Sequence, residues 1–173
     1  AVHDEHGRVR GVTALAADGS RVRLRGRLVV GADGVRSRIA RLVGAPVVET
    51  HAPSGACLYT YVGGVARDCF EFHLGDQAFA GVFPTHFDEA CVWLMRPEHL
   101  ARPVLTAGDR RLDAWAEALG ATVPGLADRV AAGEVTAPLR GAVRLPNHRR
   151  RAIGPGWALV GDAGYHRDPI TGH

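Results

Sequence analysis

The sequence predicts a mixed α/β fold, α+β overall, in which an antiparallel-sheet domain is inserted into an α/β domain. Two observations predict this arrangement. A short apolar strand that runs into a glycine-containing loop occurs near each end, at residues 28–34 and 157–162. Between them, short apolar or alternating segments are separated by Gly, Asp or Pro, which is typical of antiparallel strands. We therefore expect residues 1–50 and 146–173 to form one domain and residues 51–145 the inserted one.

The first elements of the chain are predicted to be a hairpin and a buried strand. Residues 9–15 are rich in β-branched side chains, residues 21–24 alternate, and Asp18-Gly19 between them is a turn signal, which together indicate a hairpin. The apolar run Leu28–Val30 then breaks at glycines. This break indicates a buried strand that enters a tight loop.

The loop that follows, Gly31–Gly34, precedes a predicted helix. Ser37 is of a residue type that caps helices, and we expect the helix to run to about Leu42 and to stop at Gly44. Glycines let a backbone approach a ligand closely, and the first turn of a helix offers unpaired N–H groups and a positive dipole end, which suit a phosphate. Asp33 can accept from a ribose hydroxyl or orient the loop amides. Alone, an Asp-Gly pair after a strand is usually only a turn.

The inserted domain is predicted to hold four strands followed by two helices. The strands are expected near Cys57–Val62, Cys69–Leu74, Ala78–Phe83 and Ala90–Met95. Asp109 is expected to cap a helix that ends at Gly120, with Trp115 on its buried stripe. A short helix over about residues 126–132 and an extended segment over about residues 135–144 follow.

The charge pattern argues against a nucleic-acid partner. The 173 residues include 21 basic and 18 acidic side chains, which gives a net charge of +3, and every basic residue is Arg. The one dense run, His148–Arg151, has no interleaved aromatic residues. We therefore expect a solvated loop there rather than a phosphate-binding patch. Hydrophobic residues make up 46% of the chain, which is enough for a packed core.

The remaining composition predicts a cytoplasmic protein that holds no metal and has no membrane partner. The three cysteines, Cys57, Cys69 and Cys91, form no CxxC pair, which fits buried thiols in a reducing compartment. The nine histidines show neither HxxxH nor HExxH spacing. No apolar stretch approaches the ~20 residues that span a membrane, and the polar opening segment lacks the apolar region of a signal peptide. The composition does not indicate an oligomeric state.

A second constellation lies where the strand Trp157–Val160 runs into Gly161-Asp162. A carboxylate at the carboxyl end of a buried strand lies at the rim of a parallel sheet, where ligands bind in open α/β folds. An ionised carboxylate only accepts hydrogen bonds, so Asp162 suits the hydroxyls of a sugar or polyol. Pro169 and Gly172 then shape a loop whose amides can contact a polar ring edge. The alternative is a capping aspartate in an ordinary loop.

Together and in this order, the two motifs resemble those of the flavoprotein aromatic hydroxylases, the para-hydroxybenzoate hydroxylase-like monooxygenases. That family carries an N-terminal GxGxxG, a middle DG motif and a later GD motif. Asp33–Ser37 resembles the middle motif and Gly161–Gly172 the later one. The resemblance implies part of an FAD-binding Rossmann-like domain with an inserted antiparallel-sheet substrate domain. The cofactor-binding residues that it implies are Asp33, Gly34, Arg36, Ser37, Gly161, Asp162, Pro169 and Gly172.

The family assigns different roles to these positions. Its GD aspartate binds the ribityl chain of FAD, which implies this role for Asp162, and the following loop lies beside the isoalloxazine, which implies Pro169–Gly172. Its DG loop lies close to the FAD pyrophosphate and is linked to NAD(P)H use. The chain departs from the family pattern in two places. Tyr165 occupies the usual His position of the GD motif, with His166 next to it, and Ala40 stands where the DG motif commonly has Arg.

The resemblance implies an FAD-dependent monooxygenase that uses NAD(P)H and O₂ to hydroxylate a small organic substrate, aromatic or polyketide-like. No GxGxxG occurs in the chain, so we expect an internal fragment that is inactive alone and does not retain FAD, whereas the full-length parent does. Three alternatives stay open: a related flavin-dependent halogenase, a geranylgeranyl-type reductase, and a binding module with no activity. The WxWxIP string of halogenases does not occur in the chain, which lowers the first of these.

The substrate is expected on the middle sheet. Its large apolar side chains are Phe70, Phe72, Phe79, Phe83 and Trp93. Alternation along strands is expected to send about half of them to the opposite face, into the core. No side chain is indicated as a catalytic base or nucleophile, because a flavin carries the hard chemistry itself.

Overall fold

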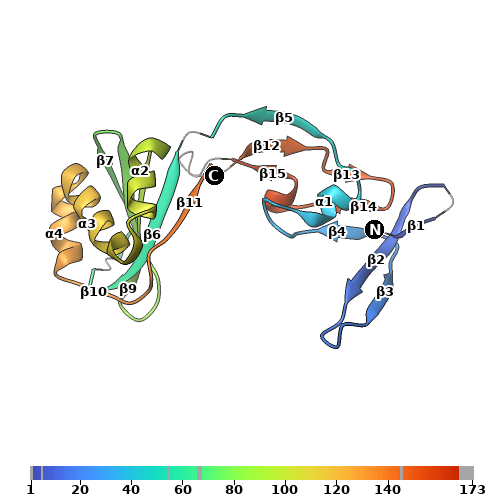
Figure 1. Cartoon of the computed structure of the whole chain (residues 1–173), viewed down its shortest axis with the longest axis horizontal. Coiled ribbons are helices and arrows are strands. Elements are labelled where there is room, and N and C mark those ends of the chain that lie inside the picture. The colour runs from blue at the N-terminus through green and yellow to red at the C-terminus, as the bar shows by residue number, and fades with distance from the viewer. Residues whose placement is uncertain (1, 5, 54, 66–67, 145, 168–173) are drawn as a thin grey trace. The chain divides into compact units, whose positions relative to one another are not determined.

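The structure, a computed structural model, describes residues 2–4, 6–53, 55–65, 68–144 and 146–167. The chain forms two compact units, of which the first combines Ala1–Ala52 with Pro146–Arg167 and the second contains Pro53–Leu145 (Figure 1). Both units contain strands and helices, which confirms the predicted mixed fold class.

The first unit opens with an antiparallel sheet of β1 (Val2–His3), β2 (Val9–Leu15) and β3 (Arg21–Arg25), in that order. The turn between β2 and β3 has Gly19 at a φ of +82°, and the amide of Ser20 donates to Asp18 Oδ1 over 2.8 Å. A glycine tolerates this left-handed conformation without steric cost. The predicted hairpin is therefore confirmed.

A second small sheet pairs a strand from the early part of the chain with strands from its late part. It contains β4 (Val29–Gly31), β13 (Ile153–Gly154) and β14 (Trp157–Leu159) in the order β13-β14-β4. The helix α1 (Arg38–Leu42) packs on it through Ala40. A Cβ at Gly31 would lie 2.8 Å from Leu159 Cδ2 and 2.9 Å from Ile39 Cβ. The glycine therefore permits the close approach of helix and strand.

The third sheet of the first unit contains β5 (Val47–His51), β12 (Asn147–Arg150) and β15 (Tyr165–His166), with β12 in the middle. The prediction of a solvated loop at His148–Arg151 is therefore wrong for most of this run. His148 is buried and Arg149 is exposed, because successive side chains of a strand point to opposite faces.

The second unit contains one sheet, with strand order β10-β6-β9-β8-β7 and β11 also paired with β6. The strands are β6 (Ala56–Gly63), β7 (Glu71–Gly75), β8 (Ala78–Pro84), β9 (Glu89–Arg96), β10 (Glu134–Val135) and β11 (Arg140–Val143). All pairings are antiparallel, as predicted. β7 begins two residues later than expected, and the single segment expected over residues 135–144 is divided by a break that contains Pro138, which cannot donate to a strand.

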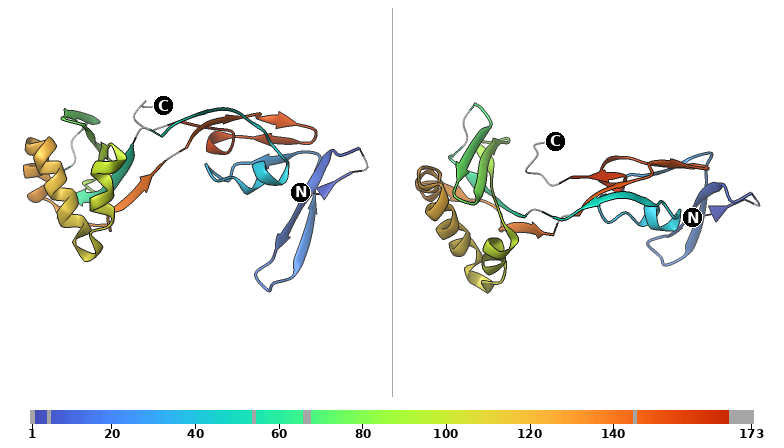
Figure 2. Two further views of the ribbon diagram at one scale, coloured as in Figure 1. Left: turned by 45° about the horizontal axis from the view of Figure 1, so that its top comes forward. Right: turned by 90° about the horizontal axis from the view of Figure 1, so that it is seen from above.

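Helices cover one face of this sheet: α2 (Glu98–Leu105), α3 (Arg111–Thr122) and α4 (Pro124–Ala131) (Figures 1 and 2). Trp115 and Leu119 are fully buried against it, so the predicted stripe on α3 is confirmed. Asp109 is not its cap, since it lies in the 3-10 turn η1 (Gly108–Arg110) and the N-cap residue Arg110 makes no side-chain capping bond. α3 also continues past Gly120, at the ~1 kcal/mol that a glycine costs inside a helix.

Two further expectations concern surface and membrane. Cys57 and Cys91 are half-buried, but Cys69 is exposed, so the expectation of buried thiols is wrong for Cys69. It lies before β7 rather than within a strand, where no neighbouring strand covers it. Among the described residues, no helix is long and apolar enough to cross a membrane, and no group of side chains has the make-up of a metal site.

Candidate functional site

The two motif loops emerge from neighbouring strands. β4 and β14 pair in parallel, with Leu159 opposite Gly31, and the amide of Val160 donates to the Gly31 carbonyl over 2.9 Å. The Asp33 loop follows β4 and the Asp162 loop follows β14. Both loops therefore leave the sheet at the same carboxyl edge, which is where open α/β folds bind their ligands.

Asp33 binds its own chain. Its Oδ1 accepts from the Ser37 hydroxyl over 2.5 Å, and its Oδ2 accepts from the amides of Arg38 and Ile39 over 2.7 and 3.0 Å. Burial raises the pKa of Asp33, but hydrogen bonds from Ser37, Ile39 and Arg38 outweigh that effect, so this pKa lies below its usual 3.8. Of the two roles considered for this carboxylate, the geometry favours orienting the loop amides over binding a ribose.

The first turn of α1 does not present unpaired amides, and this expectation is wrong. Besides the two amides bound by Asp33, the amide of Ala40 donates to Ser37 Oγ over 2.9 Å. The reason is that the side chains of Asp33 and Ser37 cap the helix twice. A phosphate at this loop would therefore need another partner.

The other residues predicted at this loop differ in exposure. Ser37 is buried and fully engaged by its capping bonds, whereas Arg36 is exposed. Gly34 has a φ of +77°, and a Cβ built on it would meet no atom within 4 Å. Arg36 is thus the one exposed cationic side chain of Asp33–Ser37, and a guanidinium suits an anion.

The Asp162 loop differs from the Asp33 loop in how its carboxylate is bonded. Gly161 has a φ of +55° with no atom within 4 Å of a built Cβ, and Asp162 is exposed in the 3-10 turn η2 (Gly161–Ala163). No hydrogen bond to the Asp162 carboxylate occurs within the described part of the chain. An exposed carboxylate here and an exposed guanidinium on the neighbouring loop fit the polyol and phosphate groups of a flavin nucleotide. Pro169 and Gly172 lie outside the described residues.

Beneath the Asp162 loop lie side chains that sequence reasoning missed. Arg150 Nη1 donates to the Ala163 carbonyl over 2.8 Å and lies 2.7 Å from His148 Nε2, and its amide donates to the Gly164 carbonyl over 2.8 Å. His166 lies beside His148, with ring centroids 6.2 Å apart, and its Nδ1 donates to the Pro146 carbonyl over 2.6 Å. Strand alternation within the His148–Arg151 run was the signal that could have found them.

The second unit presents an aromatic face on the side of the sheet away from the helices. Phe79 and Trp93 lie 4.9 Å apart, Phe83 and Trp93 5.5 Å, and Phe72 stacks on Phe79 at 5.7 Å, all between ring centroids. Phe70 contacts Phe83 at 5.1 Å. The expectation that about half of these rings enter the core is wrong. Phe72 and Trp93 both pair with Gly81, and Phe79 and Phe83 lie two residues to either side of Gly81, so these four side chains share one face of the sheet. The positions between them, Ala80, Val82 and Leu94, are fully buried instead.

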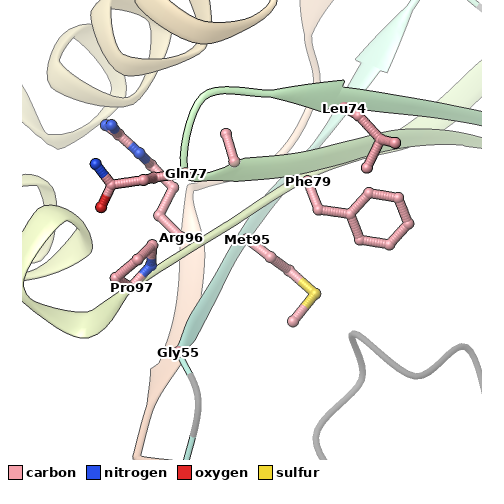
Figure 3. Close-up of a pocket in the computed structure, with 8 residues that line it drawn as sticks. Gly55, Leu74, Gln77, Phe79, Met95, Arg96 and Pro97 are labelled. Atoms are coloured by element: carbon pink, nitrogen blue, oxygen red, sulfur yellow. The ribbon is translucent and has the colours of Figure 1, made fainter.

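A cavity of about 380 Å³ lies at one end of this face, lined by Gly55, Leu74, Gln77, Ala78, Phe79, Met95, Arg96 and Pro97 (Figure 3). Figure 3 shows the Phe79 and Met95 side chains at one side and the polar ends of Arg96 and Gln77 at the other. Its volume lies in the range of pockets for small organic molecules. The wall formed by Phe79 and Met95 is apolar, while the Arg96 side chain extends to the other side of the strands, toward the helices (Figure 3).

No protein-family model matches the chain. Digeranylgeranylglycerophospholipid reductases of Methanothrix thermoacetophila and Methanocella arvoryzae are 28% and 30% identical to it, over 96% and 97% of the chain. The chain spans 41% of the length of each. The match therefore covers less than half of each reductase, and the activity of the whole reductases is not assigned to this chain by similarity alone.

Solved structures of flavoenzymes have the same fold. PqsL, a probable FAD-dependent monooxygenase from Pseudomonas aeruginosa, is 27% identical with a TM-score of 0.68, over 99% of this chain and 46% of PqsL. The myxobacterial chondrochloren halogenase CndH, a variant of FAD-dependent halogenases, is 18% identical with a TM-score of 0.80, over 98% of this chain and 40% of CndH. These matches confirm the predicted Rossmann-type flavoenzyme fold and support an FAD-dependent oxidoreductase family. The finer resemblance to para-hydroxybenzoate hydroxylase stays a prediction.

Proposed function

We propose that the full-length protein containing this chain is an FAD-dependent monooxygenase that uses NAD(P)H and O₂ to hydroxylate a small aromatic or polyketide-like substrate. One observation carries the proposal: the Asp33 and Asp162 loops leave the same carboxyl edge of a parallel strand pair. The likeness to PqsL, described as a probable FAD-dependent monooxygenase, supports the oxygenase chemistry. We also propose a cytoplasmic location, no nucleic-acid partner and no bound metal.

Residues of the two loops are proposed to contact different groups of FAD. The Asp162 carboxylate accepts from hydroxyls of the ribityl chain, and Arg36 pairs with the pyrophosphate. Asp33 and Ser37 act from within the chain by fixing the conformation of their loop. Pro169 and Gly172 are proposed to border the isoalloxazine. Bound FAD supplies the redox chemistry, while the chain supplies orientation.

The aromatic face of the second unit is proposed as one wall of the substrate site. Phe72 and Phe70 are more than half exposed, at 58% and 67%, which is unusual for such large apolar groups. Aromatic rings pack well against planar apolar molecules.

Spectra and turnover of the full-length parent test the proposal. We expect a yellow protein with flavin absorbance, and substrate-dependent NAD(P)H oxidation that places one atom of ¹⁸O₂ in the product. The isolated chain is expected to be colourless. A full-length parent that stays colourless after addition of FAD would contradict the proposal.

A second candidate is a flavin-dependent reductase of isoprenoid lipids. The observation that favours it is that both relatives described above are digeranylgeranylglycerophospholipid reductases. Such an enzyme adds hydrogen to a carbon–carbon double bond and needs no O₂. Turnover under anaerobic conditions, with a product heavier by two hydrogens and free of ¹⁸O, would therefore select the reductase over the monooxygenase. Halide-dependent turnover would instead select a halogenase, the reaction class of CndH.

A further inference from the structure

The Asp162 loop rests on a hydrogen-bonded arrangement in β12. Arg150 Nη1 contacts the Ala163 carbonyl and His148 Nε2 at once, over 2.8 and 2.7 Å. The Arg150 amide adds a bond to the Gly164 carbonyl over 2.8 Å. Strand β12 thus holds the two residues that directly follow Asp162.

These contacts fix the protonation of His148. A guanidinium has donors but no acceptor and stays charged at any ordinary pH. His148 Nε2 must therefore accept from Arg150, so it carries no proton, and Nδ1 carries the proton of the neutral ring. Protonation of Nε2 would remove this hydrogen bond and place two cations about 2.7 Å apart. The arrangement exists only while His148 is neutral.

We propose that Arg150 and neutral His148 are positioning residues that clamp the Asp162 loop for FAD, and that protonation of His148 opens the clamp and weakens FAD binding. This inference rests on the proposed FAD site. It concerns residues outside both sequence motifs, and it adds a dependence on pH that the motifs do not imply.

The groups around His148 support the clamp. Burial makes the largest contribution to lowering the pKa of His148, and the charges of Arg150 and of His166 on β15 lower it further. The backbone and the charge of Asp162 on η2 raise this pKa and partly oppose those effects. On β5 the residue in register is Thr50, which carries no charge. The net effect places the pKa of His148 below its usual 6.5.

The sign of the pH effect follows from proton uptake. With the clamp closed His148 resists protonation, whereas in the released loop it titrates near its usual value. The released state therefore binds more protons than the clamped state. Clamp stability is complete above about pH 6.5 and is lost as the pH falls from there through the lowered pKa.

Two variants of the full-length parent test the contact, with FAD affinity measured by quenching of flavin fluorescence. Arg150→Met keeps the apolar stem but has no donor, and we expect FAD binding about tenfold weaker near neutral pH, the loss typical of one hydrogen bond to a charged group. Arg149→Met is the matched control, because Arg149 neighbours Arg150 on β12 but is 56% exposed and pairs with Glu49. Its affinity is expected to equal that of the wild type.

A third variant tests the proton. His148→Gln cannot titrate, and its amide oxygen can still accept from Arg150. The wild type is expected to lose FAD affinity severalfold between about pH 7 and about pH 5, and the Gln variant is expected to keep a flat profile. If the wild type and His148→Gln show parallel pH profiles of FAD affinity, or if Arg150→Met binds FAD as tightly as the wild type, the proposed clamp is wrong. The proposed function would remain intact in either case. Absence of FAD binding in the wild-type parent at every pH would instead overturn the proposed function and this inference with it.

Discussion

The loop after β4 and the loop after β14 contain the same two residue types in opposite order, and they use their carboxylates differently. Both residues are exposed, but Asp33 accepts three hydrogen bonds from its own chain, whereas no hydrogen bond to the Asp162 carboxylate occurs among the described residues. The difference follows from what comes next along the chain. α1 begins a few residues after Asp33 and offers amides that need a partner, but only a 3-10 turn surrounds Asp162. A shared motif position therefore does not imply a shared role.

Replacing Asp162 should cause the largest loss of FAD affinity. In the full-length parent, Asp162→Ala removes an acceptor for two or more flavin hydroxyls, and we expect FAD binding about 100-fold weaker. The unfolding of the FAD-free protein should change little, because the carboxylate is exposed and accepts no hydrogen bond from the described residues. Titration with FAD and thermal unfolding of the FAD-free protein measure the two effects. A large loss of stability without loss of affinity would reverse the assignment of roles.

Replacing Arg36 tests whether the first loop contributes any ligand contact at all. Arg36→Met is expected to weaken FAD binding about tenfold at low salt, with a smaller effect as salt screens the ion pair. Arg38→Met provides the control, since Arg38 is also exposed and lies two residues away. If both variants bind FAD like the wild type, the first loop shapes the site only indirectly.

Asp33→Ala should affect folding more than binding. It removes the Asp33 part of the double cap of α1 and leaves the bond from the Ala40 amide to Ser37 Oγ. Loss of a helix cap typically costs about 1–2 kcal/mol of unfolding free energy, and FAD affinity should fall less than in Asp162→Ala. Because the folded pKa of Asp33 lies below 3.8, this stabilisation is complete above that value and is lost as the pH falls through the folded pKa. Denaturant unfolding at neutral and acidic pH checks both points. A gap between wild type and variant that persists well below the folded pKa would contradict the capping role.

Replacing Gly34 or Gly161 should have the smallest effects on the free energy of unfolding, and the two effects should be nearly equal. Gly34 and Gly161 have positive φ angles with open space around them, so Gly34→Ala and Gly161→Ala should each cost about 1 kcal/mol through backbone strain alone. Gly125→Ala in α4 is the control of opposite sign, because Gly125 also has open space but helical geometry, and Ala stabilises a helix. Denaturant unfolding measures all three.

Local structure in the first unit could be predicted from the sequence because local signals determine it. Alternation and a turn pair define the hairpin, and Ser37 with Gly44 bounds α1 within one or two residues. The pairing of β4 with β14 could not be predicted in this way. Parallel strands far apart in sequence show no local sign of their register, so the convergence of the two loops required the structure.

The errors have physical causes that recur. The charge of the run His148–Arg151 predicts a solvated loop, but alternate side chains of such a run can be buried when it forms a strand. The sequence does not indicate the helix α2, because the helix follows Pro97 and contains Pro103, and proline is usually a helix breaker. In both places tertiary packing outweighed the composition of the segment.

The third sheet of the first unit has a consequence for how such proteins diversify. β5 and β12 are paired neighbours, with Asn147 opposite His51, and the Asn147 side chain donates to the carbonyl of Ala52, 95 residues earlier. The chain therefore leaves the first unit and returns to it at adjacent positions, as it would around a simple turn. Whatever lies between those positions can be lengthened, exchanged or redesigned while the pairing of β5 with β12 and the separate pairing of β4 with β14, which aligns the two motif loops, are both kept. The chain is modular at this junction, so the second unit can change in sequence and size without rebuilding the edge proposed to hold the cofactor.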